Sequence, residues 1–141
     1  MALILLINGP NLNNLGNRAP ELYGSTTLPD VESAVAERAS ELGHEVRAYQ
    51  SNHEGAIVDF IQEHGPAADG VIINAAAYTH TSVAIHDALK LLSCPIVEVH
   101  LSDPHTREEF RHKSFIEPLA AHIFKGLGKD SYIAAIKALA A

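Results

Sequence analysis

The sequence predicts an α/β fold in which five parallel strands form a doubly wound sheet within one domain. Short apolar runs alternate with longer amphipathic runs along the chain, and this alternation is typical of βαβ units. The chain has 141 residues, enough for one domain with a full hydrophobic core. Five strands and roughly four long helices suit the strand order 2-1-3-4-5. We find no internal repeat, linker or low-complexity tract, so we expect a single domain over residues 1–141.

Each expected element follows from a local pattern. The strands are short apolar runs, often β-branched, expected at residues 2–8, 45–51, 70–74, 96–100 and 122–125. The helices have apolar residues three or four positions apart and are expected at residues 27–42, 54–64, 81–92 and 129–139. Pro29 suits the first turn of the first helix and Gly43 its end, while Gly65-Pro66 ends the second. Residues 101–116 are expected to be mostly loop.

The composition is that of an ordinary globular protein and disfavours several function classes. Hydrophobic residues make up 47% of the chain and charged residues 19%, and no apolar run approaches the roughly 20 residues that span a bilayer. The net charge of -7 argues against a nucleic-acid partner. Met1 leads directly into a strand without a signal-peptide pattern, and the single Cys94 allows no internal disulfide. We therefore expect a cytoplasmic protein that holds any anionic ligand with a few placed cations.

The connection after the first strand is unusually long. Residues 12–24 are polar and punctuated by Gly and Pro, and they carry Arg18 and Tyr23. A connection of this length within a compact domain is usually a binding loop or lid. It leaves the carboxyl end of a strand, where open parallel sheets bind ligands. We therefore expect an active-site lid over about residues 12–24 that bears one cation and one phenol.

Polar residues gather where the first four expected strands end. Because the carboxyl ends of parallel strands lie at one edge of the sheet, side chains that follow different strands should converge there. The candidates are Asn8, Asn11, Ser51, Asn52, His53, Glu54, Asn74, Tyr78, Thr79, His80, Thr81, Ser82, Glu98, His100, Ser102 and Asp103. The sequence therefore predicts a polar site at this edge.

Some candidates also have purely structural interpretations. Asn52 and Thr81 fit helix capping as well as a functional role, and Glu54 fits the positive dipole at a helix start. Residues 107–111 hold two arginines and two glutamates, which fit either a solvated charge cluster or an anion site. Packing or surface roles fit a further group, namely His44, His53, His64, His86, His122, Tyr49 and Tyr132.

Signature motifs of other classes are missing. The chain has no GxGxxG or GxxxxGK[ST] phosphate loop, no HExxH, no Cys/His spacing of a zinc site and no GxSxG nucleophile elbow. The missing phosphate loops disfavour a mononucleotide-binding module, and the missing nucleophile elbow disfavours a hydrolase. The third expected strand ends in Asn74 rather than Asp, so a receiver domain would lack its phospho-acceptor. No lysine ends a core strand, which disfavours a Schiff-base mechanism.

Four long motifs occur in order along nearly the whole chain. They are NGPNLNNLGNRAPELYG at residues 8–24, QSNHEG at 50–55, INAAAYTHTSVAIHDAL at 73–89 and EVHLSDPHTREEFRHKS at 98–114. Together they resemble the type II 3-dehydroquinate dehydratase family. The resemblance implies a flavodoxin-like fold, a dodecamer built as a tetramer of trimers, and no metal or organic cofactor. It also implies dehydration of 3-dehydroquinate to 3-dehydroshikimate by anti elimination through an enolate, in the shikimate pathway or in quinate breakdown.

The resemblance assigns catalytic roles to five residues. Tyr23 matches the base and Arg18 matches the cation beside it. A free phenol has a pKa near ~10 and needs roughly 4 kcal/mol of stabilisation to ionise at pH 7, and an adjacent guanidinium favours the phenolate. His100 matches the acid that protonates the leaving hydroxyl, and Glu98 would orient it from the same strand face. Asn11 matches the residue that holds an enolate-stabilising water. The matched substrate-binding positions are Asn74, His80, Asp87, Leu101, Ser102 and Arg111.

Within that set, Arg111 is the expected bidentate partner of the substrate carboxylate, helped by the backbone amides of residues 101 and 102. Asp87 matches a residue that reaches the active site of the neighbouring subunit. His53 and Glu54 resemble supporting residues around the site.

The chain departs from the family pattern at Asn14, Ala19, Ala75-Ala76 and Asp103-Pro104. None of these departures removes a catalytic group. The charge of Asp103 would lie near an anion site, and Ala resists backbone shapes that are open to Gly. The alternative from a different class is a catalytically inactive relative that binds a small carboxylate, and the retained acid and base disfavour it.

Overall fold

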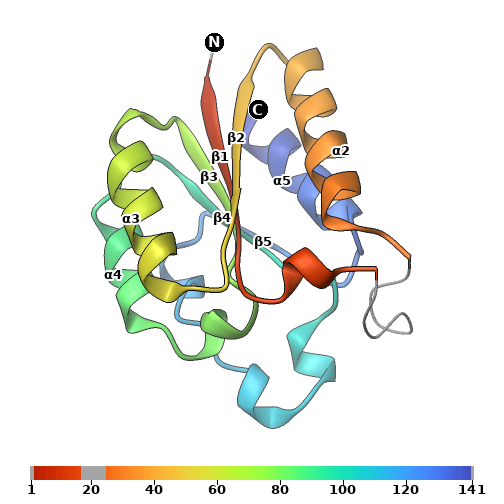
Figure 1. The fold of residues 1–141 in the computed structure, drawn as a ribbon, viewed down its shortest axis with the longest axis vertical. Helices are drawn as coiled ribbons and strands as arrows, with labels where there is room; N and C mark the ends of the chain where they lie inside the picture. The colour runs from red at the N-terminus through yellow and green to blue at the C-terminus, as the bar shows by residue number, and fades with distance from the viewer. Residues whose placement is uncertain (1, 17–24, 141) are drawn as a thin grey trace.

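The computed structural model describes residues 2–16 and 25–140, and its described strands form one parallel sheet (Figure 1). The strands are β1 (Leu3–Asn8), β2 (Glu45–Gln50), β3 (Gly70–Asn74), β4 (Ile96–Val99) and β5 (His122–Phe124). Their order is β2-β1-β3-β4-β5 and every pairing is parallel. The predicted doubly wound, flavodoxin-like order 2-1-3-4-5 is therefore confirmed.

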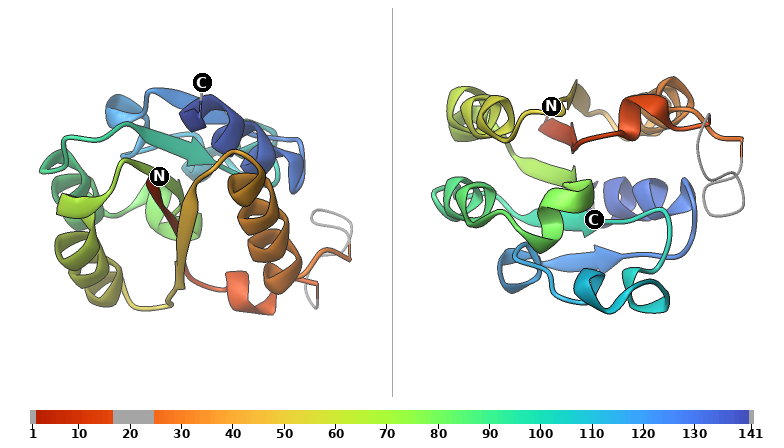
Figure 2. Two further views of the ribbon diagram at one scale, coloured as in Figure 1. Left: turned by 90° about the horizontal axis from the view of Figure 1, so that it is seen from above. Right: turned by 60° about the horizontal axis from the view of Figure 1, so that its bottom comes forward.

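Two helices cover each face of the sheet. The helices α2 (Leu28–Glu41) and α5 (Asp130–Ala140) lie on one face, while α3 (Glu54–His64) and α4 (Val83–Lys90) lie on the other (Figure 2, left). Side chains alternate between the two faces along each strand. In β1, Ile4 and Leu6 pack under α2 and α5, whereas Leu5 and Ile7 pack under α3 and α4. The three central strands β1, β3 and β4 are thus buried on both faces, which leaves their carboxyl ends as the place for a site.

The residues at the capping positions of two helices differ from the sequence expectation. Ser82, not Thr81, caps α4, because the Ser82 hydroxyl accepts from the N–H of Ile85 at 2.9 Å. Before α3, His53 occupies the capping position and makes no side-chain cap. The capping interpretation of Asn52 and Thr81 is therefore wrong for both residues.

The ends of β1 and β3 approach closely beside the site. Gly9 follows β1 and donates its N–H to the carbonyl of Asn74 at 2.8 Å. A Cβ on Gly9 would lie 2.3 Å from the carbonyl oxygen of Ala75, so the position requires glycine. Beyond β3, Ala76 has a φ of 53°, in the left-handed region that alanine resists. This is one of the positions where the chain departs from the family pattern.

The long segments beside the site contain only single turns of helix in the described residues. Part of the expected lid forms a 3₁₀ turn, η1 (Leu12–Asn14), and Leu12 packs into the core. Residues 17–24 of the lid lie outside the described residues. The expected loop over residues 101–116 contains η4 (Pro104–Thr106) and η5 (Glu109–Arg111). None of the helices described is long and apolar enough to cross a membrane.

Candidate active site

A cavity of about 130 Å³ opens at the carboxyl ends of β1, β3 and β4. This edge of the sheet faces the bottom of Figure 1, beside the cyan 3₁₀ turns. Seven of the predicted site residues line the cavity: Asn11, Asn74, His80, His100, Leu101, Ser102 and Arg111. The predicted convergence of residues that are far apart in sequence therefore occurs within one chain.

The remaining predicted residues are not at the cavity wall. Arg18 and Tyr23 lie outside the described residues. Asp87 is exposed on α4 and does not line the cavity of its own chain. His53 and Glu54 line neither this cavity nor the smaller one behind His100. The structure thus does not bring these two proposed supporting residues to the site.

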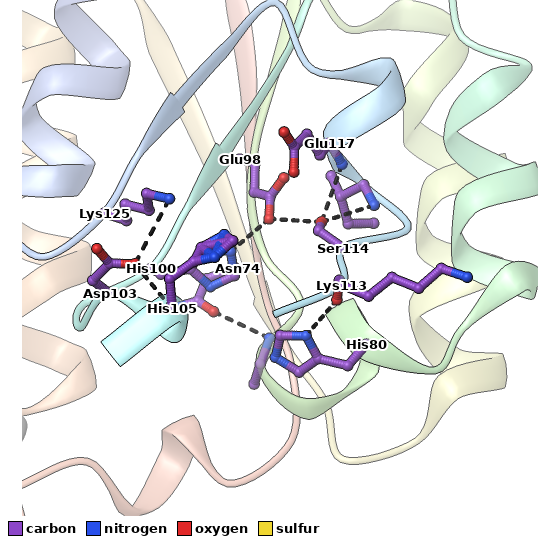
Figure 3. A network of polar contacts seen from close by, with 12 residues as sticks. Asn74, His80, Glu98, His100, Asp103, His105, Lys113, Ser114, Glu117 and Lys125 are labelled. Carbon is purple, nitrogen blue, oxygen red and sulfur yellow. Dashed lines mark hydrogen bonds and ion pairs between the residues drawn. The ribbon is translucent and has the colours of Figure 1, made fainter. Parts of the chain in front are cut away.

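His100 lines the cavity, while its buried partner Glu98 lies behind it and lines the smaller cavity. The Nε2 atom of His100 lies 2.6 Å from Oε2 of Glu98, and the two residues are 7% and 2% exposed. Glu98 belongs to β4 and His100 follows it two residues later, so both side chains leave the same face of the strand. Figure 3 shows Glu98 between His100 and Ser114, whose hydroxyl lies 2.8 Å from the same Oε2. A buried carboxylate at this distance holds the imidazole in one orientation, which a positioned general acid requires.

A buried tyrosine fixes the amide of Asn74. Tyr132 in α5 is 1% exposed, and its hydroxyl donates to Oδ1 of Asn8 at 2.6 Å and accepts from Nδ2 of Asn74 at 2.9 Å. Burial raises the pKa of Tyr132, so this phenol stays protonated. The Oδ1 atom of Asn74 accepts from the N–H of Ala76. The sequence predicts a packing role for Tyr132 and gives no sign of its hydrogen bonds to the floor of the site.

The imidazole of His80 is held as a neutral ring. Its Nδ1 atom lies 2.7 Å from the carbonyl oxygen of Lys113 and donates to it, as Figure 3 shows. Burial is the largest cause that lowers the pKa of His80, and it outweighs the hydrogen bond to Lys113, which raises this pKa. The neutral ring therefore carries its proton on Nδ1 and leaves Nε2 as an acceptor.

Arg111 is part of a charge cluster and of the cavity wall at once. Its Nε atom pairs with Oε1 of Glu108 at 3.0 Å, and Glu108 is also 3.9 Å from Nε of Arg107. The N–H of Glu108 itself, then the Arg111 guanidinium, lower the pKa of the Glu108 carboxyl. Because Arg107 and Arg111 also line the cavity, two cations border it. The two interpretations of residues 107–111 are therefore compatible.

Asn52 supports the turn that carries Asn11. The Oδ1 atom of Asn52 accepts from the N–H of Asn11 at 2.9 Å and from Nε2 of Gln50 at 3.2 Å. Gln50 also donates to the carbonyl of Gly9. Asn11 has a φ of 70°, a left-handed conformation that asparagine tolerates better than most residues. Its side chain makes no cap to η1, so it can serve the cavity instead.

The described residues contain no group of three or more His, Cys, Asp and Glu that could hold a metal ion. What the cavity does offer is a histidine paired with a carboxylate, a neutral histidine, two amides and two guanidinium groups. These groups suit an anionic, hydroxyl-bearing small molecule and the transfer of a proton to it.

Comparison with known proteins gives the family. Residues 2–140 match the model of the family described as dehydroquinase class II. The chain belongs to this family. The 3-dehydroquinate dehydratase 1 of Agrobacterium fabrum is 50% identical over 137 residues, which cover 97% of this chain and 94% of that protein. The catabolic 3-dehydroquinase of Aspergillus clavatus is 53% identical over 137 residues, which cover 97% of this chain and 91% of that protein. The crystal structure of type II dehydroquinase from Butyrivibrio crossotus matches with a TM-score of 0.96 and 46% identity, over 99% of this chain and 98% of that one.

Membership of the class II dehydroquinase family makes this chain an enzyme of the hydro-lyase class. Asp103, which departs from the family pattern, places a negative charge next to residues of the cavity wall. That carboxylate accepts from the N–H of His105 at 3.0 Å and lies 3.6 Å from Nζ of Lys125. The His105 N–H is the largest cause that lowers its pKa. Because Asp103 does not line the cavity, its charge is held away from the site by these two partners.

Proposed function

We propose that this chain removes water from 3-dehydroquinate to give 3-dehydroshikimate, without a metal or organic cofactor, in one catalytic domain over residues 1–141. The elimination is anti and passes through an enolate. Tyr23 takes a proton from the carbon next to the ketone, and His100 gives a proton to the departing hydroxyl, so the elements of water leave. The relatives named above, which are called 3-dehydroquinate dehydratase and catabolic 3-dehydroquinase, support this reaction.

The pair of His100 and Glu98 is the observation that carries the proposal. Hydroxide is a poor leaving group, so its departure at neutral pH needs a positioned acid. An imidazole on a cavity wall with a buried carboxylate 2.6 Å behind it fits that role. A site that only bound a carboxylate would have no need for this pair. The acid side of the reaction is therefore supported by geometry and not by resemblance alone.

The cations and amides around the cavity support the binding of the substrate. Arg111 receives the carboxylate, because its Nε is held by Glu108 while its two Nη atoms form a fork that matches a carboxylate. The backbone amides of Leu101 and Ser102 share this load. Asn74 and the neutral ring of His80 bind hydroxyl groups of the substrate. The lining of the cavity, with its amides, imidazoles and guanidinium groups, suits a compact ring that carries hydroxyl groups and a carboxylate.

The base and the enolate are assigned from the sequence. Tyr23 and Arg18 lie on one connection, five positions apart, and an adjacent guanidinium favours the phenolate. The lid over about residues 12–24 would exclude water and strengthen that effect. Asn11, held by Asn52 at the start of this connection, binds the water that stabilises the enolate oxygen.

The assembly and the cellular setting follow from the family in the same way. We expect a dodecamer built from four trimers, in which Asp87 of one subunit enters the site of its neighbour. The exposure of Asp87 on α4 is compatible with this contact. We expect the enzyme in the cytoplasm, with a role in the shikimate pathway or in quinate catabolism.

The test is the ultraviolet absorbance of the purified enzyme mixed with 3-dehydroquinate. The conjugated enone product gives a rise that we expect to fall by orders of magnitude in Tyr23→Phe and in His100→Ala, with substrate binding largely kept. Prior dialysis against a chelator should leave the rate unchanged, because no metal is proposed. No rise with the intact enzyme would favour the binding-only alternative, and a near-normal rate in either variant would refute its assigned role.

A further inference from the structure

The hydroxyl of Ser114 has all three of its hydrogen-bonding positions in use. Ser114 lies between η5 and η6 (Glu117–Leu119), on the segment that also carries Arg111. Its Oγ atom is 3.1 Å from the backbone nitrogen of Ile116, 3.1 Å from that of Glu117 and 2.8 Å from Oε2 of Glu98 (Figure 3). A hydroxyl donates one hydrogen bond and accepts two. The use of each position is therefore determined by its three partners.

The two backbone N–H groups decide the direction of the third bond. An amide N–H can only donate, so the amides of Ile116 and Glu117 occupy both lone pairs of the Ser114 oxygen. The Ser114 proton must then point to Oε2 of Glu98. A protonated Oε2 could not donate in return, because the serine oxygen has no lone pair left. The Oε2 atom of Glu98 is thus an acceptor without a proton.

The same constraint passes from Glu98 to His100. Because Oε2 carries no proton, the 2.6 Å contact with Nε2 of His100 requires the imidazole to donate from Nε2. The proton that His100 can release is then the one on Nδ1. The other oxygen of Glu98, Oε1, is buried and has no hydrogen-bond partner among the described residues. Apart from His100, Ser114 is thus the group that holds this carboxylate in the described part of the chain.

We propose that Ser114 is a positioning residue of the dehydration: through Glu98 it fixes His100 with Nε2–H bound and Nδ1 as the proton-donating atom. This inference depends on the proposed role of His100 as the acid. Ser114 is not among the residues that line the cavity of about 130 Å³. Its effect is therefore on the acid step and not on substrate binding.

The central experiment compares Ser114→Ala with Ser114→Thr by steady-state kinetics. We expect Ser114→Ala to lower kcat roughly 10- to 100-fold with KM changed less than about threefold, the range that applies to residues that orient metal-binding histidines. Ser114→Thr keeps the hydroxyl and should recover most of the lost rate. Ser114→Cys keeps the size but donates weakly, so it should resemble Ser114→Ala and serves if the alanine variant folds poorly.

A double-mutant cycle separates this role from a merely structural one. If Ser114 acts through Glu98, then Ser114→Ala should cause no further loss of kcat in a Glu98→Ala background. Ser82→Ala is the matched control, because it also removes a buried hydroxyl that accepts from a backbone amide, but at the start of α4. It should lower stability and leave kcat unchanged. Independent, additive losses at Ser114 and Glu98 would overturn the inference.

The ring nitrogens of His100 give a readout besides activity. In protein labelled with ¹⁵N-histidine, the wild type should show His100 protonated at Nε2, and Ser114→Ala should show a mixture of tautomers. A wild-type enzyme with normal turnover and an unchanged Ser114→Ala variant would refute the role of Ser114 alone. A wild-type protein without turnover would instead refute the proposed function, so the two failures are distinguishable.

Discussion

Substitution of Gly9 by alanine tests the close approach of β1 and β3 at the site. The added Cβ would lie 2.3 Å from the carbonyl oxygen of Ala75 and 2.6 Å from its carbonyl carbon, about 1 Å closer than ordinary contact. These are backbone atoms, so the strand ends must separate. The 2.8 Å hydrogen bond from Gly9 to Asn74 would break, at a cost of about 1 kcal/mol, and overpacking costs about 1–3 kcal/mol more. We expect the free energy of unfolding to fall by about 2–4 kcal/mol.

The assay is urea denaturation followed by circular dichroism, together with a thermal melt. At about 3 °C for each kcal/mol in a chain of this length, Gly9→Ala should lower Tm by roughly 6–12 °C. Gly55→Ala is the control, because a Cβ there meets nothing within 4 Å and alanine is favoured over glycine in a helix by about 1 kcal/mol. It should leave Tm equal or raise it. A denaturation midpoint for Gly9→Ala equal to that of the wild type would refute the close approach.

Three further predictions concern groups at the cavity. Arg111→Ala should raise KM for 3-dehydroquinate roughly 10- to 100-fold with kcat largely kept, because a charge-assisted hydrogen bond contributes about 1.5–3 kcal/mol; an unchanged KM would contradict the carboxylate assignment. Tyr132→Phe should lower the free energy of unfolding in urea by about 2–4 kcal/mol, because it leaves two buried amide groups unpaired, whereas Tyr49→Phe should stay within about 0.5 kcal/mol; equal losses would refute the network. Burial lowers the pKa of His80 below its ordinary 6.5, so the unfolded chain binds the proton more readily as the pH falls through that value. Stability is therefore lost from about pH 7 downward, and His80→Gln should lessen that loss; parallel stability curves for the two proteins would contradict it.

The sequence predicts the fold well because the signals for it are local. The bounds of α3 and β3 match the expected residues 54–64 and 70–74, since Gly65-Pro66 ends the helix and Asn74 ends the apolar run. The sheet order follows from chain alternation and strand number. The convergence of polar residues at one edge follows from the parallel arrangement alone. The helix starts are less certain because adjacent Thr81 and Ser82 are both good caps, and propensity does not choose between them.

The sequence could not predict which polar side chains hold one another. Tyr132 lies 124 residues from Asn8 in the chain, and an aromatic residue in an apolar helix pattern gives no sign of a hydrogen bond to a strand end. The position of Asn52 fits a local helix cap, but its partner is the distant Asn11. Ser114 is the last residue of the motif at residues 98–114, and no local sequence pattern indicates that it binds Glu98. These contacts depend on tertiary packing, and for this reason only the structure brings them out.

Three polar groups in the described wall of the cavity or directly behind it are held in one orientation. The amide of Asn74 is fixed at both ends, His80 is fixed by the carbonyl of Lys113, and Glu98 is fixed by Ser114. For His80, this bond uses Nδ1 and leaves Nε2 for the substrate. Groups oriented in this way need no rearrangement when charge develops in the transition state. Folding therefore supplies the orientation before the substrate arrives, and residues that never touch the substrate should affect kcat more than KM.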